Sequence, residues 1–309
     1  MKNILILGGF GFLGTNTMKY AEKYDKTFRF IVLDRYEQHP AGVCFDNVVK
    51  TYAGDFTDSV LLERIFAENQ IDYVFHMLST TIPVGSNNAQ YDVESNLIPT
   101  LNILNLMVKY KVNEIVYLSS GGAIYGIRER GKHREIDEVF PISSYGIVKL
   151  TIEKYLMQYA QTYEISPLIL RLSNPYGPYH YNMKQGVINV AMTRALKNEV
   201  LEVWGNGKGK KDYIFVEDFV RILYKLIEKG IKNEVINVAS GQTLSVNEIV
   251  VEIKHLLPNL NVEYKDAQRF DANHFELDTT KLLKLIPNFS FTSFQEGLQK
   301  TYYWSKTIC

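Results

Sequence analysis

A glycine-rich turn near the start of the chain constrains the fold more than any other feature. The sequence Gly8-Gly9-Phe10-Gly11-Phe12-Leu13-Gly14 follows a short apolar run, Asn3–Leu7, and precedes an amphipathic stretch, Leu13–Tyr24. Glycines at these spacings permit a tight turn, close approach of a pyrophosphate, and close packing of a helix on a strand. The N-terminus of the helix that follows also favours an anion. The turn therefore predicts a dinucleotide-binding site between a first strand and a first helix.

An acidic residue lies where such a site needs one. Asp34 follows the next apolar run, Phe28–Leu33, about 20 residues beyond the turn. Its carboxylate can accept hydrogen bonds from the ribose hydroxyls and would repel a 2′-phosphate, which favours NAD over NADP. The neighbouring Arg35 could instead pair with that phosphate, or it could be a solvated surface charge.

The rest of the chain alternates short apolar runs with longer amphipathic stretches. Strands are predicted in five runs: Asn3–Leu7, Phe28–Leu33, Tyr73–His76, Glu114–Leu118 and Leu168–Leu172. Helices are predicted in four stretches: Leu13–Tyr24, Ser59–Glu68, Tyr91–Tyr110 and Tyr145–Tyr163. This alternation predicts an α/β fold of Rossmann type, with a doubly wound parallel sheet.

The pattern changes after about Asn174, where Pro175, Gly177 and Pro178 interrupt regularity. We therefore expect an NAD-binding domain over residues 1–174, to which some later segments return. Residues 175–309 are expected to form mainly a smaller C-terminal α/β lobe for the substrate.

Composition narrows the class of partner and the compartment. Lys and Arg total 34, as do Asp and Glu, and this balance argues against a nucleic-acid binder. Two isolated cysteines, Cys44 and Cys309, are typical of free thiols in a reducing compartment. The N-terminal apolar run is too short for a signal peptide, and no run has the roughly 18 apolar residues of a membrane span. We expect a cytoplasmic protein, and the His, Cys and Asp spacings predict no metal site.

A second motif, Tyr145-Gly146-Ile147-Val148-Lys149, carries acid–base chemistry. Residues four apart share one face of a helix, which places a phenol beside an ammonium group. The cation is expected to lower the pKa of Tyr145 and make it a usable general acid or base. The run Ser119-Ser120, at the end of a predicted strand, supplies hydroxyl groups for the same site.

Further segments share the pattern of one family. They are GDFTD with Asp55, LST at 78–80, Asn96, LSSGGAIYG at 118–126, RLSNPYGP at 171–178, KDYIFVED at 211–218 and DTTK at 278–281. Together with the glycine turn and the Tyr145/Lys149 pair, they resemble the extended short-chain dehydrogenase/reductase family in its NAD-dependent epimerase/dehydratase branch. The chain is most similar there to UDP-glucose 4-epimerases and their relatives.

The resemblance implies a set of site residues. Cofactor contacts are implied for Gly8, Gly11, Phe12, Leu13, Gly14, Asp34, Arg35, Asp55, Phe56, Leu78, Ser79, Thr80, Asn96, Ser119, Tyr145 and Lys149. Contacts to a UDP- or dTDP-linked sugar are implied for Ser120, Gly121, Asn174, Gln185, Lys211, Gln268, Arg269 and Phe275. Catalysis is assigned to Tyr145 and Lys149 with Ser119 or Ser120.

Three departures from the family pattern bear on the reaction. Gly121 stands where many members carry the hydroxyl that assists the tyrosine, so Ser119, Ser120 or a water must replace it. Gly122 and Ala123 stand where dehydratases carry an Asp-Glu pair, so this chain lacks the groups for water loss. Lys211 and Gln268, the latter beside Arg269, replace two phosphate-facing arginines, and lysine lacks the bidentate fork of arginine.

These observations favour NAD-dependent epimerisation of a nucleotide-activated hexose at C4 through a transient 4-keto intermediate. The alternatives are a reductase of a nucleotide-linked 4-keto-6-deoxyhexose and a non-catalytic NAD-sensing module. By the resemblance, counted back from Asp278, Phe275 stands where 4-epimerases carry a residue that gates the sugar pocket. Its bulk would then favour a plain hexose or 6-deoxyhexose over an N-acetylhexosamine, unless this ring merely packs in the core. Family members often pair through the two helices that correspond to 97–110 and 145–163. Their apolar positions here predict a homodimer, unless all of them are buried within the monomer; they are Leu101, Leu104, Val108, Ile152, Leu156 and Tyr159.

Overall fold

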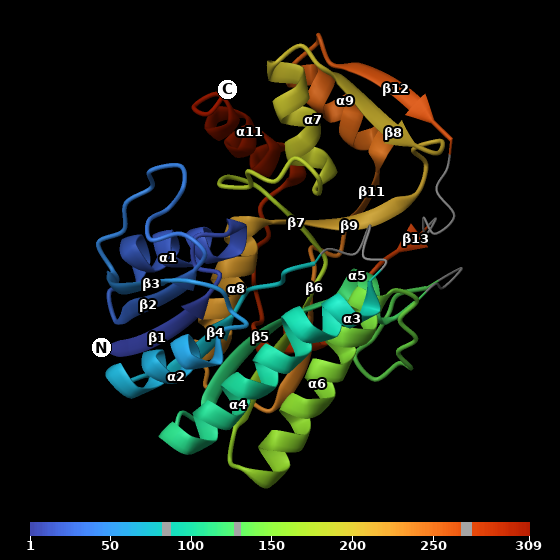
Figure 1. Cartoon of the computed structure of the whole chain (residues 1–309). Helices are drawn as coiled ribbons and strands as arrows, with labels where there is room; N and C mark the ends of the chain where they lie inside the picture. Colours follow the sequence, from blue (N-terminus) through green and yellow to red (C-terminus); the bar gives the residue numbers. More distant parts are fainter. Residues whose placement is uncertain (82–87, 127–130, 267–273) are drawn as a thin grey trace. The chain divides into compact units, whose positions relative to one another are not determined.

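The computed structural model describes residues 1–81, 88–126, 131–266 and 274–309 (Figure 1). The chain forms two compact units. The first comprises Met1–Gly126, Val139–Arg171 and Leu226–Ile236, and the second comprises Ile127–Glu138, Leu172–Lys225 and Asn237–Cys309.

A seven-stranded sheet organises the first unit, in the order β10-β6-β5-β4-β1-β2-β3. Its strands are β1 (Lys2–Leu7), β2 (Phe28–Asp34), β3 (Val48–Ala53), β4 (Tyr73–His76), β5 (Glu114–Ser120), β6 (Ser166–Leu172) and β10 (Glu234–Val238). The strands from β3 to β5 pair in parallel. The chain builds outward from β1 on one side and then on the other, which places the switch of direction between β1 and β4. This is the doubly wound Rossmann arrangement predicted from the sequence.

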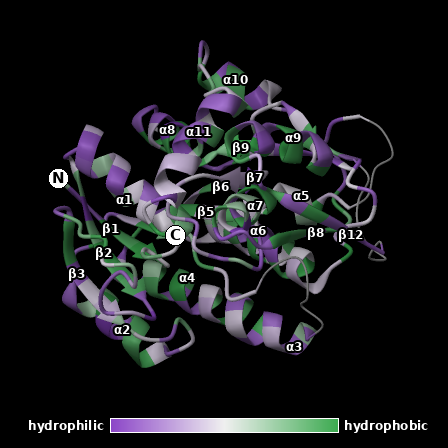
Figure 2. Ribbon diagram, turned by 90° about the horizontal axis from the view of Figure 1, so that it is seen from above, coloured by the Kyte–Doolittle hydropathy of each residue, from purple (hydrophilic) through white to green (hydrophobic). Residues whose placement is uncertain are grey.

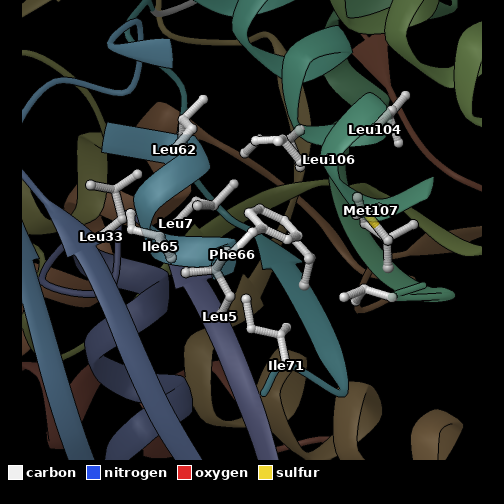
Figure 3. Packing of buried hydrophobic residues seen from close by; sticks show 14 of the residues in the cluster. Leu5, Leu7, Leu33, Leu62, Ile65, Phe66, Ile71, Leu104, Leu106 and Met107 are labelled. Atoms are coloured by element: carbon white, nitrogen blue, oxygen red, sulfur yellow. The ribbon is translucent and has the colours of Figure 1, made fainter. Parts of the chain in front are cut away.

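Helices cover both faces of this sheet. They are α1 (Phe12–Tyr24), α2 (Ser59–Glu68), α3 (Ala89–Asp92), the π-helix η1 (Val93–Leu97), α4 (Ile98–Tyr110), α5 (Gly121–Ile124) and α6 (Ser144–Thr162). Side chains of α2, α4 and α6 pack on one face in a single buried cluster, part of which is drawn in Figure 3. Within it, Leu5 and Leu7 of β1 lie under Leu62 and Phe66 of α2. Figure 2 shows the hydrophobic strands of the sheet and the more hydrophilic surface of α1.

The second face of the sheet is covered by α1. Side chains along a strand point to opposite faces in turn. Ile6 and Val32 therefore lie on the other face from Leu5 and Leu7, and a side chain at Gly9 would contact both of them. Helix α1 buries Met18 and Ala21, so the glycine turn leads directly into a helix that covers this second face.

The second unit contains two small sheets and several helices. Its strands are β7 (Asn174–Tyr176), β8 (Val200–Trp204), β9 (Lys210–Phe215), β11 (Thr243–Ser245), β12 (Asn261–Lys265) and β13 (His274–Phe275). Its helices are α7 (Val187–Leu196), α9 (Val246–Leu256), α10 (Thr280–Leu285) and α11 (Phe294–Ser305), and α8 (Val216–Glu228) begins in this unit and ends in the first. Strand β9 pairs with β7, β11 and β13, while β8 pairs with β12.

The five predicted strands and three of the four predicted helices agree with the structure. Strands β3 and β10 of the large sheet were not predicted; β3 has three exposed residues of six, and its sequence VVKTYA has no continuous apolar run. The single helix predicted over Tyr91–Tyr110 is instead α3, η1 and α4 in succession. Within the described ranges, no helix is both long and apolar enough to cross a membrane.

Candidate active site

The glycine turn between β1 and α1 leaves space for a ligand by excluding side chains. Gly8 has φ +76°, a left-handed conformation that favours glycine, and a Cβ on Gly14 would lie 2.5 Å from the carbonyl oxygen of Gly8. Helix α1 begins after Gly11, which has no side chain to cap the first N–H groups of the helix. These groups can therefore bind an anion, so the turn fits the pyrophosphate of a dinucleotide.

Asp34 lies at the end of β2 beside this turn. Its Oδ2 accepts a hydrogen bond from the backbone N–H of Phe10 at 3.0 Å. Burial raises the pKa of Asp34, although backbone hydrogen bonds from Phe10, Tyr36 and Arg35 oppose that rise. The carboxylate is only partly buried, so it can still accept bonds from a ribose. Asp34 and the glycine cradle together fit NAD.

The side chains of Asp55 and Phe56 lie in different surroundings. The carboxylate of Asp55 accepts bonds from the backbone and hydroxyl of Thr57, and the nearby Arg35 charge also lowers its pKa. Arg35 therefore faces a carboxylate, which partly offsets its charge. The ring of Phe56 is buried and meets the ring of His76 at 5.3 Å, so only the backbone of Phe56 is available to a ligand.

A polar network joins the segment after β4 to the π-helix. The backbone N–H of Thr80 donates to Asn96 Oδ1 at 2.9 Å, and Asn96 Nδ2 donates to Thr80 Oγ1 at 2.7 Å. The Ser95 hydroxyl also bonds Thr80 Oγ1 at 2.7 Å. Leu78 lies against Gly8, where a Cβ would approach it to 3.2 Å, and the Ser79 hydroxyl donates to the Thr81 carbonyl. The Leu78–Thr80 segment is thus held beside the glycine turn.

Tyr145 and Lys149 lie in the first turns of α6, which Ser143 caps by accepting from the Gly146 N–H. Lys149 is buried, and its Nζ donates to the Leu118 carbonyl at 2.8 Å. The Nζ lies 4.9 Å from the ring centroid of Tyr117 and 5.8 Å from that of Tyr145. The lysine is therefore fixed between β5 and the catalytic tyrosine predicted from the sequence.

The protonation of this pair differs from the simple expectation. Burial raises the pKa of Tyr145 to about 12, although a hydrogen bond with the Ser120 side chain opposes the rise. Burial lowers the pKa of Lys149 to about 8, while the charge of Glu153 opposes that change. The sequence predicts a lowered tyrosine pKa from the neighbouring cation; in the structure desolvation of the phenolate raises the pKa instead.

The two serines at the end of β5 have different partners. Ser119 is buried and donates its hydroxyl to Glu153 Oε1, whereas the Ser120 side chain bonds Tyr145. Gly121 follows at the start of α5 and is buried. Helix α5 lies so close to α6 that a Cβ on Gly146 would clash with the Ala123 carbonyl oxygen. Of the two candidates for the missing hydroxyl, Ser120 is the one beside the tyrosine.

The residues predicted to bind the sugar nucleotide belong to the second unit, apart from Ser120 and Gly121. Strand pairing aligns Asn174 of β7 with Tyr213 of β9, and Phe275 of β13 with Lys211 of β9. Three neighbouring strands thus bring Asn174, Lys211 and Phe275 together. Gln185 is exposed in the segment before α7, away from these strands in sequence and pairing. Gln268 and Arg269 lie outside the described residues.

Buried polar groups that the sequence did not single out support this cluster. Asp212 accepts from the Ser173 hydroxyl, from the N–H and hydroxyl of Ser240 and from the N–H of Gly241, and its carbonyl accepts from Asn174 Nδ2 at 2.8 Å. Phe275 is 5% exposed, and its ring stacks on that of His133 at 5.6 Å. His133 belongs to none of the motifs found in the sequence. Only folding of the chain brings it beside β13.

Two more buried groups in the first unit, Glu153 and Arg171, were given no role from the sequence. A signal for Glu153 was present, since residues 145, 149 and 153 lie at four-residue intervals on one face of a helix. Within the described ranges, no cluster of three or more His, Cys, Asp or Glu side chains could hold a metal ion.

A Rossmann sheet with a glycine cradle, a strand-end aspartate and a Tyr-x-x-x-Lys helix defines an NAD-dependent enzyme of the extended short-chain dehydrogenase/reductase type. Residues 4–239 match the model of the NAD dependent epimerase/dehydratase family, and the chain belongs to that family. Its cofactor is NAD, and it is an enzyme of the epimerase/dehydratase class.

Individual relatives match nearly the whole chain. A putative UDP-glucose 4-epimerase from Methanocaldococcus jannaschii is 31% identical, with 98% of each chain covered. The structure of UDP-glucose 4-epimerase from Thermotoga maritima with UDP-glucose superposes with a TM-score of 0.91 at 30% identity, covering 99% of each chain. The dTDP-4-dehydro-6-deoxyglucose reductase of Escherichia coli is 26% identical over 96% of this chain and 95% of its own.

Proposed function

We propose that this protein interconverts the C4 epimers of a nucleotide-activated hexose through a transient 4-keto sugar, with NAD as a resident cofactor. The observation that carries the proposal is the Tyr145–Ser120 pair beside a fixed Lys149, without an acid–base pair at Gly122 and Ala123. The similarity to two proteins named as UDP-glucose 4-epimerases supports it. Loss of water would require groups that these positions lack.

The residues of the first unit would act as follows. The Tyr145 phenol exchanges a proton with the 4-hydroxyl of the sugar, and the Ser120 hydroxyl, bonded to Tyr145, holds that oxygen in place. Lys149, held on the Leu118 carbonyl, places a positive charge near the phenol ring. NAD, when bound, supplies the hydride acceptor and donor. In this proposal the glycine turn holds its pyrophosphate and Asp34 its adenosine ribose.

We assign the sugar-nucleotide contacts mainly to the second unit. Asn174 would hydrogen bond the substrate, and the Lys211 ammonium would bind a phosphate as a point charge rather than bidentately. Phe275 would limit the space at C2 of the sugar, because overfilling a packed site costs about 1–3 kcal/mol. The burial of Phe275 against His133 allows the simpler role of core packing, so the preference for plain hexoses is a proposal to be measured.

The second candidate is reduction of a nucleotide-linked 4-keto-6-deoxyhexose. The similarity to the E. coli reductase favours it, and the same Tyr145 and Lys149 would serve it. The two reactions differ in their demand for cofactor, since an epimerase returns the hydride to the sugar whereas a reductase consumes external NADH or NADPH.

One experiment separates the candidates. Purified protein is denatured and released NAD is measured; intact protein is then incubated with UDP-, dTDP- and GDP-sugars, including UDP-glucose and UDP-N-acetylglucosamine, without added cofactor. We expect bound NAD and formation of the C4 epimer of a plain hexose. Tyr145→Phe should keep its NAD and lose about 10²- to 10⁴-fold in turnover. Product formation only with added NADH and a 4-keto sugar would instead establish the reductase.

A further inference from the structure

Helix α6 carries three ionisable side chains in a row, and only two of them belong to the proposed chemistry. Tyr145, Lys149 and Glu153 follow one another at four-residue intervals, so they lie on one face of the helix. Glu153 is 2% exposed. Carboxylates are almost never this deeply buried unless they are paired, and the pairing indicates what the group does.

Glu153 has two kinds of partner. Arg171 of β6, itself buried, donates to both carboxylate oxygens, with Nη2 at 2.8 Å from Oε2 and Nε at 3.2 Å from each oxygen. The Ser119 hydroxyl donates to Oε1. Arg171 Nη1 also donates to the Tyr125 hydroxyl at 2.8 Å, which anchors the guanidinium from the other side. This bidentate geometry leaves the carboxylate little freedom to move.

Among the described groups that interact with Lys149, none apart from Glu153 is an anion. Its ammonium lies against the neutral rings of Tyr117 on β5 and Tyr145 on α6, and His76 on β4 is buried with its pKa lowered to about 3. The Lys149 charge itself contributes to that lowering. Glu153 is therefore the negative charge that faces the lysine, and it opposes the effect of burial on the lysine.

We propose that Glu153 is a positioning residue of the active site: fixed by Arg171, its carboxylate keeps Lys149 positively charged and draws Ser119 away, which leaves Ser120 to serve Tyr145. This role rests on the proposed function of Tyr145 and Lys149 as the acid–base pair. The simpler role is a structural ion pair that joins α6 to β6. The two differ in whether the protonation of Lys149 depends on the Glu153 charge.

A titration of Lys149 in the full-length, NAD-loaded protein tests the proposal. Lysine labelled with ¹³C at Cε is incorporated, and the Lys149 resonance is assigned by its absence in Lys149→Met. In Glu153→Gln, which keeps an oxygen for Ser119 but removes the charge, we expect the pKa of Lys149 to fall below that of the parent by on the order of 1 unit. Lys154→Gln removes an exposed charge from the adjacent residue and should leave the titration unchanged.

A second variant guards against misfolding, because Glu153→Gln leaves the buried Arg171 charge without its partner. Glu153→Gln/Arg171→Met removes both charges, and it should still lower the Lys149 pKa, by a smaller amount. An unchanged Lys149 titration in a folded variant would overturn the proposal. No sugar is needed for the measurement, so a mistaken reaction or substrate would leave this result intact. Conversely, epimerisation by the parent would not rescue an unchanged titration.

Discussion

Ser119 and Ser120 are adjacent in sequence but serve different groups. Both hydroxyls bond side chains of α6, but each bonds a different one. The sequence could not choose between them, because the choice depends on how the end of β5 is oriented toward α6. In the structure Ser119 donates to the buried Glu153, and Ser120 bonds Tyr145.

Alanine variants of the two serines should therefore have different effects. Ser120→Ala removes a hydrogen bond to the acid–base tyrosine, and we expect kcat to fall about 10- to 100-fold with little loss of stability. Ser119→Ala leaves Glu153 with one partner fewer, and we expect a loss of about 1–3 kcal/mol in unfolding free energy with a smaller change in kcat. Steady-state kinetics and chemical denaturation measure both. A larger kcat loss in Ser119→Ala, or normal kcat in both variants, would contradict the assignment.

Motifs identify residue types more readily than protonation states. The Tyr145/Lys149 spacing is visible in the sequence, and the structure places the two side chains together. The pKa of Tyr145 nevertheless lies above its ordinary value, because desolvation depends on the strands and helices that enclose the phenol. The same holds for Asp34: its position at a strand end was predicted, whereas the effect of burial on its pKa was not.

At the scale of elements, regular patterns were predictable and irregular ones were not. The strands with continuous apolar runs were all found, since burial on both faces leaves a clear signal. The π-helix Val93–Leu97 has no such signal in the sequence, because its apolar residues continue the helical period of the flanking helices. It is held by the Thr80, Ser95 and Asn96 network, and such π-turns inside helices are frequent at functional sites.

The turn between β1 and α1 yields a prediction at this scale. A Cβ on Gly14 would lie 2.5 Å and 2.6 Å from the carbonyl oxygens of Gly8 and Gly9, so α1 would have to move away from the strand. We expect Gly14→Ala to lose NAD during purification and to lower the unfolding free energy by about 1–3 kcal/mol. The measurement is the NAD content per chain, together with denaturation.

Gly230→Ala is the matched control for that variant. Gly230 has φ +66° but open space around its Cα, so alanine there strains only the backbone. We expect Gly230→Ala to lose some stability, about 1–2 kcal/mol, and to retain NAD. Full NAD occupancy in Gly14→Ala would mean that the turn tolerates a side chain and that close packing at this glycine is unnecessary.

For the whole molecule, the sequence predicts the fold class and the return of some later segments to the first domain, but it does not say which segments these are. The βα alternation is local, and it was sufficient to predict the Rossmann sheet. The return of Leu226–Ile236 to the first unit, and of Ile127–Glu138 to the second, depends on contacts between residues far apart in the chain. No local pattern marks such a return.

Assembly is the remaining question at this scale, and we propose a two-fold dimer through α4 and α6. Half of the apolar residues that suggested it, Leu104, Ile152 and Leu156, are buried in the protein's own core. Other side chains keep the faces of these helices apolar. Ile98 is 47% exposed, Ile147 is 52% exposed and Tyr155 is 39% exposed, while Leu101, Val108 and Tyr159 are partly buried.

A charge on this face should therefore separate the subunits. Pairing α4 and α6 with their symmetry copies would bury Ile98, Ile147 and Tyr155, and a glutamate at 147 would place an unpaired charge in that interface. We expect light scattering at micromolar concentration to give the mass of a dimer for the parent and of a monomer for Ile147→Glu, with NAD retained in both. Val60→Glu is the control: Val60 is also exposed, at 78%, but lies on α2, so this variant should remain dimeric. A monomeric parent would refute the dimer, and a dimeric Ile147→Glu would place the interface on another surface.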